Sequence, residues 1–521
     1  MKPVEIPQQP WRQLAFVLGE AALSLISSGV LFIIISRVSG PTLLGTYALA
    51  FAWLILFQGA SSFGIPEFLM REVGAYRRDA AGQVVHAMLL GLGSGFVALC
   101  LMQAAVRLVG YSTYLVQVIT IASLAMIPAF LNTACRSVFL ALRMMHLTFL
   151  ALLVEVTIVM SASLYLLFSG YGALALIITL VIAKITSASI ALTLLYRRVL
   201  PVRPPFNLGF LIRTARTVFT FGIGNMLAML TLRINTIMVS LWVDIAAVGH
   251  FAAATKIMEI GLIIPNLFAQ ILMTRIAYSF NTQGNRDPNR FGAWYQVLFS
   301  FVVPACVGVW VFAGLILETL FGSGFGNARW VLRILMIYFM IESADSEMSV
   351  ILQAAHRQRE DVSRLAFNPL TNIVLNLVLL PGLGTIGAAI GRVGGVCASA
   401  TLRYLLIARE LTGVNWFRFA RKPALISIGV GSVCYALLDV GHPAWLLLFY
   451  VAATAVLLVI SSSFSLAAIK DMMSFPSRDS AAGAPDAEPL SAEPLNAEPN
   501  GPAAPTEIRV RNWQTESFKP A

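Results

Sequence analysis

Long apolar stretches, separated by short polar connections, follow one another along most of the chain. Each is about as long as the roughly 20 residues that a helix needs to cross the hydrocarbon core of a bilayer. The stretches lie near residues 14–37, 46–70, 84–107, 115–135, 147–168, 172–196, 217–241, 248–274, 294–317, 330–352, 363–380, 386–408, 424–440 and 444–468. The pattern predicts an all-α polytopic membrane protein with about 14 transmembrane helices.

A duplicated stretch organises these helices. Residues Ser36–Arg71 recur in degenerate form as Ser240–Arg275, at an offset of 204 residues that places Gly45 on Gly249. Six predicted spans separate the two copies, so both begin from the same side of the membrane. The sequence therefore predicts two parallel six-helix halves around a central cavity, with the last two spans as an appended helix pair.

The predicted domain boundaries follow from this division. They are an N-terminal half at 1–200, a C-terminal half at 201–422, the appended helices at 423–470 and a disordered cytoplasmic tail at 471–521. The connector Tyr196–Pro205 is basic and proline-rich, which suits a joint between two halves that rock against each other. The tail is rich in Ala, Pro, Glu, Ser and Asn, a composition too polar to bury a core.

The composition changes this picture little. Of the 521 residues, 58% are hydrophobic and 12% charged, and the mean hydropathy is +0.80, which excludes a soluble globular domain. The net charge of +11 does not indicate nucleic-acid binding, because the cations lie between apolar spans rather than on a soluble basic face. The five cysteines are scattered singly within apolar spans, with no metal or disulfide spacing, and we expect them to pack as small core residues.

The basic residues are unevenly distributed between the predicted loops. With a cytoplasmic N-terminus, the inner loops carry Arg71, Arg77, Arg78, Arg136, Arg143, Arg197, Arg198, Arg203, Arg275, Arg286, Arg290, Arg357, Arg359, Arg364, Arg409, Arg418, Arg421 and Lys422. The outer loops carry little beyond Arg37, Arg107 and Arg329, and Arg37 is interpreted as an interfacial anchor or part of the repeated motif. Because positive charge is retained on the cytoplasmic side, both termini are predicted to be cytoplasmic.

The motif SRVSGPTLLGTYALA, at Ser36–Ala50, resembles the opening of the polysaccharide transporter family, the bacterial oligosaccharide flippases of the multidrug/oligosaccharidyl-lipid/polysaccharide exporter superfamily. The similarity extends over roughly residues 10–470. It continues in LRINTIMVS (Leu232–Ser240), VDIAAVGHFAAATKIMEIGLIIP (Val243–Pro265), FGSGFGNARWVLRIL (Phe321–Leu335), ILQAAHRQR (Ile351–Arg359) and TIGAAIGRVGG (Thr385–Gly395). Asn235 departs from the family pattern, which usually has an aspartate near this place.

The resemblance implies a function. A member of this family would translocate a polyprenyl-pyrophosphate-linked oligosaccharide from the cytoplasmic to the periplasmic leaflet of the bacterial inner membrane, by alternating access and for lipopolysaccharide, capsule or exopolysaccharide synthesis. It would be a transporter rather than an enzyme, without a cofactor or metal. Its expected partners are the lipid-linked oligosaccharide, membrane lipids and a polysaccharide polymerase or export complex.

Four cations within the predicted spans are candidates for binding the pyrophosphate, namely Lys184, Arg233, Lys256 and Arg392. Arginine contacts phosphate in a bidentate manner, and lysine acts as a compact point charge. The alternative is that each pairs with a local carboxylate or reaches outward. Lys256 and Glu259 are three residues apart on one helical face, and Arg392 is close to its helix start.

Buried carboxylates are candidates for coupling transport to H⁺ or Na⁺, and Glu20, Glu155, Glu259 and Glu342 are predicted for this role. Asp345 and Glu347 follow Glu342 in the same span. The alternative role of these acids is to form ion pairs that hold helices together.

Prolines and glycines mark further features of the spans. Pro66, Pro128, Pro265 and Pro304 are predicted to interrupt their helices, as packing kinks or as hinges. The glycine-rich runs at 91–93 and 391–395 predict close approach of helices rather than a nucleotide site.

Three other functions compete with the flippase prediction. An ion-coupled exporter of the same superfamily acting on drugs has the same composition. A membrane polymerase or ligase would need a sizeable outer loop, and the predicted outer loops are short. A non-transporting scaffold would rely on the long tail.

Overall fold

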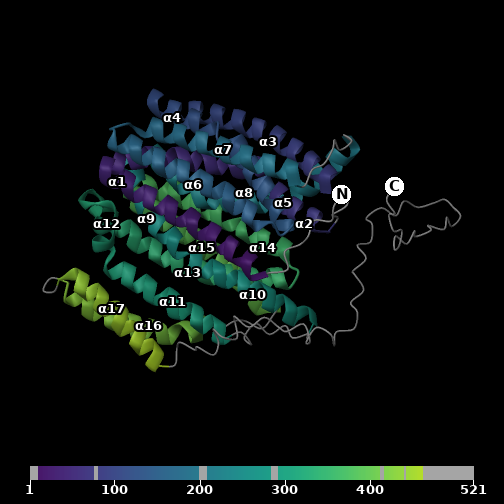
Figure 1. The fold of residues 1–521 in the computed structure, drawn as a ribbon. Coiled ribbons are helices and arrows are strands. Elements are labelled where there is room, and N and C mark those ends of the chain that lie inside the picture. Colours follow the sequence, from purple (N-terminus) through teal and green to yellow (C-terminus); the bar gives the residue numbers. More distant parts are fainter. Residues whose placement is uncertain are drawn as a thin grey trace, which may run out of the picture. The chain divides into compact units, whose positions relative to one another are not determined.

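The computed structural model describes residues 10–75, 80–198, 208–282, 292–410, 416–438 and 442–461. All regular secondary structure in these ranges is helical, and the long helices run alongside one another (Figure 1). The helices are α1 (Pro10–Ser62), α2 (Ile65–Ala75), α3 (Ala80–Val109), α4 (Thr113–Ser123), α5 (Met126–Ala141), α6 (Met145–Phe168), α7 (Ala173–Arg198), α8 (Leu208–Trp242), α9 (Ile245–Gly261), α10 (Ile263–Thr282), α11 (Gly292–Val311), α12 (Ala313–Phe321), the 3₁₀-helix η2 (Ser323–Ala328), α13 (Arg329–Ala354), α14 (Gln358–Leu365), α15 (Phe367–Glu410), α16 (Trp416–Ala436) and α17 (Pro443–Ile460). The predicted disordered tail and the end of the last predicted span lie outside the described residues.

Two of these helices each contain a reversal of direction. The backbone leaves the helical region at Gly40 in α1 and at Gly384 in α15, with φ angles of 74° and 54°. Only glycine adopts such positive φ angles at no steric cost. Across the first reversal, the ring centroids of Phe32 and Tyr47 lie 5.9 Å apart, whereas a straight helix would separate the two residues by about 22 Å.

The number of membrane crossings agrees with the prediction. Ten stretches of described helix are long and apolar enough to span a membrane, and two of them, Gly19–Gly59 and Gln358–Arg409, contain the reversals. Counting each of these as two crossings, and adding α13 and α16 with 26 and 21 residues, gives fourteen. The predicted fold class, an all-α polytopic membrane protein, is confirmed.

Three of the four predicted interruptions are breaks between helices. Pro66, Pro128 and Pro265 each fall within the first three residues of α2, α5 and α10. Proline lacks an N–H group, and the first turn of a helix needs none for intrahelical bonding. Pro304 differs because α11 continues through it to Val311.

The two copies of the duplicated stretch pack directly against each other, α1 against α9. A Cβ on Gly45 would collide with the carbonyl oxygen of Ile245, and a Cβ on Gly249 would collide with the carbonyl oxygen of Pro41. The offset of 204 residues relates Gly45 to Gly249 and Pro41 to Ile245. One contact is therefore made twice about a pseudo-two-fold axis, as expected for two parallel halves. We call this pair of contacts the glycine contact.

Polar contacts join the predicted halves at the end of the bundle that carries Gly40, which we call the Gly40 end. Arg37 Nε donates to the carbonyl oxygen of Leu320, 2.9 Å away in the last turn of α12. A cation complements the free carbonyl groups at a helix C-terminus. The Tyr111 hydroxyl lies 2.6 Å from Ser240 Oγ. Arg37 thus links two helices of different predicted halves.

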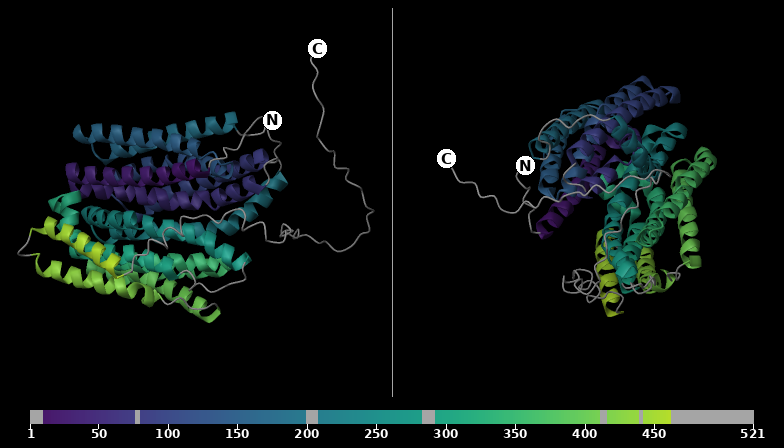
Figure 2. Two further views of the ribbon diagram at one scale, coloured as in Figure 1. Left: turned by 60° about the horizontal axis from the view of Figure 1, so that its bottom comes forward. Right: turned by 90° about the vertical axis from the view of Figure 1, so that its right-hand side faces the viewer.

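The appended helices α16 and α17 pack against each other and against α11, at one edge of the bundle (Figure 2). The Tyr450 hydroxyl donates to the carbonyl oxygen of Pro304 at 2.9 Å.

Cys434 is buried in the small apolar core at this junction, but Cys100 on α3 is exposed, so the prediction that all cysteines are core residues was wrong. The outer face of a membrane helix meets lipid, where an apolar side chain carries no penalty.

The glycine runs behave as predicted at most positions. A Cβ on Gly91 would collide with the Phe130 ring on α5, and a Cβ on Gly391 would collide with the Asn376 side chain across the reversal in α15. Gly93 has no such neighbour within 4 Å. Close packing therefore explains Gly91 and Gly391 but not Gly93.

Candidate functional site

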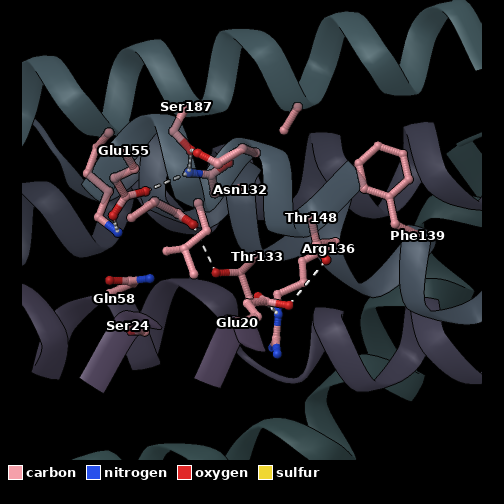
Figure 3. A pocket seen from close by; sticks show the side chains of 15 residues that line it. Glu20, Ser24, Gln58, Asn132, Thr133, Arg136, Phe139, Thr148, Glu155 and Ser187 are labelled. Atoms are coloured by element: carbon pink, nitrogen blue, oxygen red, sulfur yellow. Dashed lines mark hydrogen bonds and ion pairs between the residues drawn. The ribbon is translucent and has the colours of Figure 1, made fainter. Parts of the chain in front are cut away.

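A polar cavity of about 170 Å³ lies among helices α1, α5, α6 and α7 (Figure 3). We call it the polar pocket. The charged, amide and hydroxyl side chains that line it are Glu20, Ser24, Gln58, Asn132, Thr133, Arg136, Thr148, Glu155, Lys184 and Ser187. Polar groups within a membrane bundle cost free energy unless they have partners or face water, so their pairing decides what the pocket can do.

Lys184 and Glu155 form an ion pair near the middle of α7 and α6. The distance from Lys184 Nζ to Glu155 Oε1 is 2.6 Å. Asn132 Nδ2 donates to Glu155 Oε2 at 3.3 Å and to Ser187 Oγ at 2.9 Å, and Ser187 donates to the carbonyl oxygen of Ala151 at 3.0 Å. The candidate substrate-binding cation and the candidate ion-coupling acid are thus direct partners.

Glu20 and Arg136 form the second pair in the polar pocket, and both point into it in Figure 3. Arg136 Nε donates to Glu20 Oε1 at 2.5 Å, and Thr148 Oγ1 donates to Glu20 Oε2 at 3.2 Å. The prediction of a loop position for Arg136 was wrong, because α5 continues past the apolar stretch to Ala141.

Arg233 and Lys256 share a third carboxylate, that of Glu259. Arg233 Nη1 lies 3.0 Å from Glu259 Oε1, and Lys256 Nζ lies 3.8 Å from Glu259 Oε2. These residues belong to α8 and α9, in the predicted C-terminal half. The alternative interpretation, that Glu259 neutralises Lys256 locally, therefore agrees with one of the contacts of Lys256.

The same two cations also contact α1, in the predicted N-terminal half. Lys256 Nζ donates to Ser28 Oγ at 2.9 Å and lies 4.9 Å from the centroid of the Phe32 ring. The guanidinium carbon of Arg233 lies 5.8 Å from the centroid of the Phe51 ring. Cation–π contacts of this kind stabilise a charge away from water.

Two further cavities extend the polar pocket. One of about 140 Å³ is lined by Lys184 and Glu155 and by Ser28 and Phe51. Lys256 donates to Ser28, and Arg233 lies over the Phe51 ring, so these two cations contact the wall of this cavity without lining it. The other, of about 420 Å³, shares three residues with the polar pocket, namely Gln58, Thr133 and Arg136, and is also lined by Asn225 and Met229 of α8. Residues of both predicted halves therefore line these adjoining cavities, with Asn225 and Met229 from the predicted C-terminal half.

Arg392, the fourth candidate cation, lies elsewhere. Its side chain is fully buried in α15, with 0% exposure, and its guanidinium carbon lies 4.6 Å from the centroid of the Tyr338 ring. Its three side-chain nitrogens have no hydrogen-bond partner among the described residues. Arg392 does not reach outward. Like Arg233 and Lys256 it lines none of the three cavities described above, but unlike them it has no contact with a residue that does line one among the contacts described above.

A buried network joins α13, α14 and α15. Arg403 donates to Asp345 and, at 2.8 Å, to Asp361. Ser399 donates to Asp345 at 3.1 Å. Two acids of α13 therefore differ in their pairing. Asp345 has partners, whereas both carboxylate oxygens of the fully buried Glu347 lack a hydrogen-bond partner among the described residues.

Asn235, the departure from the family pattern, is fully buried between α8 and α15. Asn376 Nδ2 donates to Asn235 Oδ1 at 2.5 Å and to Asn372 Oδ1 at 3.1 Å. A neutral amide cluster therefore occupies this place.

No group of three or more His, Cys, Asp or Glu side chains that could hold a metal ion is present within the described ranges.

Several residues that pair with the candidate site residues were not predicted from the sequence. Asn132 and Arg136 lie four residues apart, as do Ser399 and Arg403, and residues at this spacing share a helix face. A search for polar residues at this spacing within the apolar spans would have indicated both faces. Asp361 carried no such signal, since α14 lies outside the longest apolar runs.

Comparisons with known proteins find a polysaccharide biosynthesis family and solved structures of membrane transporters. A sequence model of the family described as polysaccharide biosynthesis protein matches residues 17–276. The solved structure of the lipid II flippase MurJ in an inward closed conformation is similar to this chain with a TM-score of 0.71 at 14% identity, covering 86% of this chain and 98% of that one.

Two transporter structures are also similar. An inward-facing multidrug resistance MATE family transporter of the MOP superfamily has a TM-score of 0.60 at 16% identity, covering 74% of this chain and 94% of that one. A MOP superfamily transporter from Pyrococcus furiosus has a TM-score of 0.55 at 16% identity, covering 75% and 92%. No match was found among curated protein sequences. At these identities the structural likeness shows the fold.

Proposed function

The chain belongs to the polysaccharide biosynthesis protein family of MOP superfamily transporters, and from this premise we propose that it flips a polyprenyl-pyrophosphate-linked oligosaccharide across the bacterial inner membrane. The movement is from the cytoplasmic to the periplasmic leaflet, by alternating access and without hydrolysis of the substrate. The product would feed the synthesis of a surface polysaccharide.

The observation that carries this proposal is the placement of three buried cations around one cavity, with Lys184 in its lining and with Lys256 and Arg233 in contact with Ser28 and Phe51 of its wall. A pyrophosphate in hydrocarbon costs at least a few kcal/mol without partners. Cations from α7, α8 and α9 would offset that cost, since lysine and arginine are the side chains that bind phosphate. Oligosaccharide hydroxyls would find partners among the amide and hydroxyl groups of the polar pocket.

The proposal also assigns the two sides of the protein. The inner loops predicted from the arginine distribution make both termini cytoplasmic, so the Gly40 end would face the periplasm. The glycine contact and the Arg37 contact join the predicted halves at that end. The cavity between α2, α5 and α8 reaches Glu67 and Met70, near the predicted cytoplasmic side. This structure would therefore be closed outward.

The experiment that tests the proposal compares two classes of substrate in proteoliposomes. One is a fluorescent polyprenyl-pyrophosphate oligosaccharide, whose flipping is read from quenching of the exposed leaflet, and the other is an organic cation such as ethidium. We expect flipping of the lipid and no transport of the cation. Transport of the cation without flipping of the lipid, under imposed H⁺ and Na⁺ gradients, would instead make the protein a multidrug-type exporter.

A further inference from the structure

Glu259 occupies an unusual position between two cations. Its two carboxylate oxygens face different partners, Oε1 facing Arg233 at 3.0 Å and Oε2 facing Lys256 at 3.8 Å. All three side chains are largely buried, and the Lys256 side chain is only 9% exposed. One negative charge is shared by two positive charges, so the group keeps an excess positive charge.

The group also keeps an unused donor. Arg233 Nε is buried and has no hydrogen-bond partner among the described residues. A guanidinium binds phosphate best through two parallel N–H donors, and Glu259 uses only one. A ligand with more oxygens and more charge than a carboxylate would satisfy Arg233 and Lys256 better than Glu259 does.

Through Lys256, binding of such a ligand would also affect the packing of the two predicted halves. Lys256 donates to Ser28 on α1, whereas Glu259 lies on the same helix as Lys256 itself. A ligand that draws Lys256 away from Ser28 therefore removes a hydrogen bond between α9 and α1. The neighbouring Ser28 and Phe51 line the cavity that reaches Lys184.

We propose that Glu259 is an internal counter-ion that takes, in the empty transporter, the place of the substrate's diphosphate. The inference rests on the proposed function and specifies how the same site works. Glu259 neutralises Arg233 and Lys256 when no substrate is present, which keeps bare cations out of a low-dielectric interior. The diphosphate displaces it on binding, and Glu259 returns to displace the diphosphate on release. Glu155, at 2.6 Å from Lys184, performs the same exchange in the other half.

The test measures affinity and turnover separately, in the full-length protein. The probe for affinity is farnesyl diphosphate, titrated by calorimetry against the detergent-solubilised wild type and Glu259→Gln. Glu318→Gln is the matched control, since it makes the same charge change in α12, away from the site. Glu155→Gln is the second variant, and a thermal melt checks that each variant is folded.

We expect Glu259→Gln to bind the probe at least tenfold more tightly and to flip the lipid-linked oligosaccharide at least tenfold more slowly, with Glu318→Gln unchanged in both. A merely structural role would lower affinity and turnover together. Should Glu259→Gln fail to fold, the same two opposite changes are expected in Glu155→Gln.

Other results would overturn the inference. If the wild type binds the probe and flips the lipid, but folded Glu259→Gln and Glu155→Gln bind no more tightly, the carboxylates do not compete with the diphosphate and the proposed function stands. If no variant binds the probe and the wild type flips no lipid, both the inference and the proposed function fail.

Discussion

Adding one methyl group at Gly249 tests the packing of the two predicted halves. The Cβ of Gly249→Ala would overlap the carbonyl oxygen of Pro41, and that of Gly45→Ala would overlap the carbonyl oxygen of Ile245. Backbone atoms cannot rotate away as the end of a side chain can, so α1 and α9 must separate. Overpacking of this kind costs about 1–3 kcal/mol, against a gain of about 0.5–1 kcal/mol from replacing a helical glycine by alanine.

The chain offers a matched control and a symmetry test. Gly93→Ala, in α3, meets nothing within 4 Å, so only the favourable backbone effect of about 0.5–1 kcal/mol remains. We expect Gly45→Ala and Gly249→Ala to lower the melting temperature in detergent by similar amounts, because the pseudo-two-fold axis relates the two contacts. The double variant should cost less than the sum, since either methyl group already separates the same pair of helices.

The assay is intrinsic tryptophan fluorescence during a thermal ramp of the purified protein, which has 9 tryptophans. Equal melting temperatures for Gly249→Ala and Gly93→Ala would refute the close approach of α1 and α9. A large loss at Gly249 with none at Gly45 would refute the symmetric contact.

Three further predictions follow from individual contacts. Arg37→Ala removes the cation at the C-terminus of α12 and should lower stability by about 0.3–2 kcal/mol; an unchanged melting temperature would show that the contact contributes nothing. Arg403→Ala leaves Asp345 and Asp361 as unpaired buried carboxylates and should cost about 3–5 kcal/mol, read as a large loss of folded protein in size-exclusion chromatography; a normal yield would contradict this. Tyr111→Phe removes one hydrogen bond to Ser240 and should cost about 1 kcal/mol in the same thermal ramp, with Tyr165→Phe as an exposed control.

The fold was largely predictable because a bilayer imposes a length on each crossing. Runs of about 20 apolar residues mark helices whatever their neighbours are, and the recurrence of Gly45 as Gly249 indicated the duplication. The reversals at Gly40 and Gly384 fall between predicted spans, as a short turn requires. The breaks ahead of Pro66, Pro128 and Pro265 follow from the missing N–H group, whereas nothing local distinguishes Pro304, whose helix continues.

The candidate site was predictable by residue type but not by partner. A charged side chain within an apolar span costs free energy unless it is paired or faces water, and this rule identified Lys184, Arg233 and Lys256 as candidates. Their pairing depends on which helix faces turn toward one another, and this follows from tertiary packing. Arg392 shows the limit, because its place near the start of a span is equally compatible with a cavity, with lipid or with the buried position that it has.

The role of the buried cations in transport is tested by measuring how fast the wild type, Lys184→Ala and Arg233→Ala flip a labelled polyprenyl-pyrophosphate oligosaccharide in proteoliposomes. We expect the wild type to flip the lipid and both variants to lose at least tenfold in rate while keeping a cooperative melt. Wild-type rates in both folded variants would contradict this role, because Lys184, in the cavity lining, and Arg233, against Phe51 of its wall, would then have no part in moving the diphosphate.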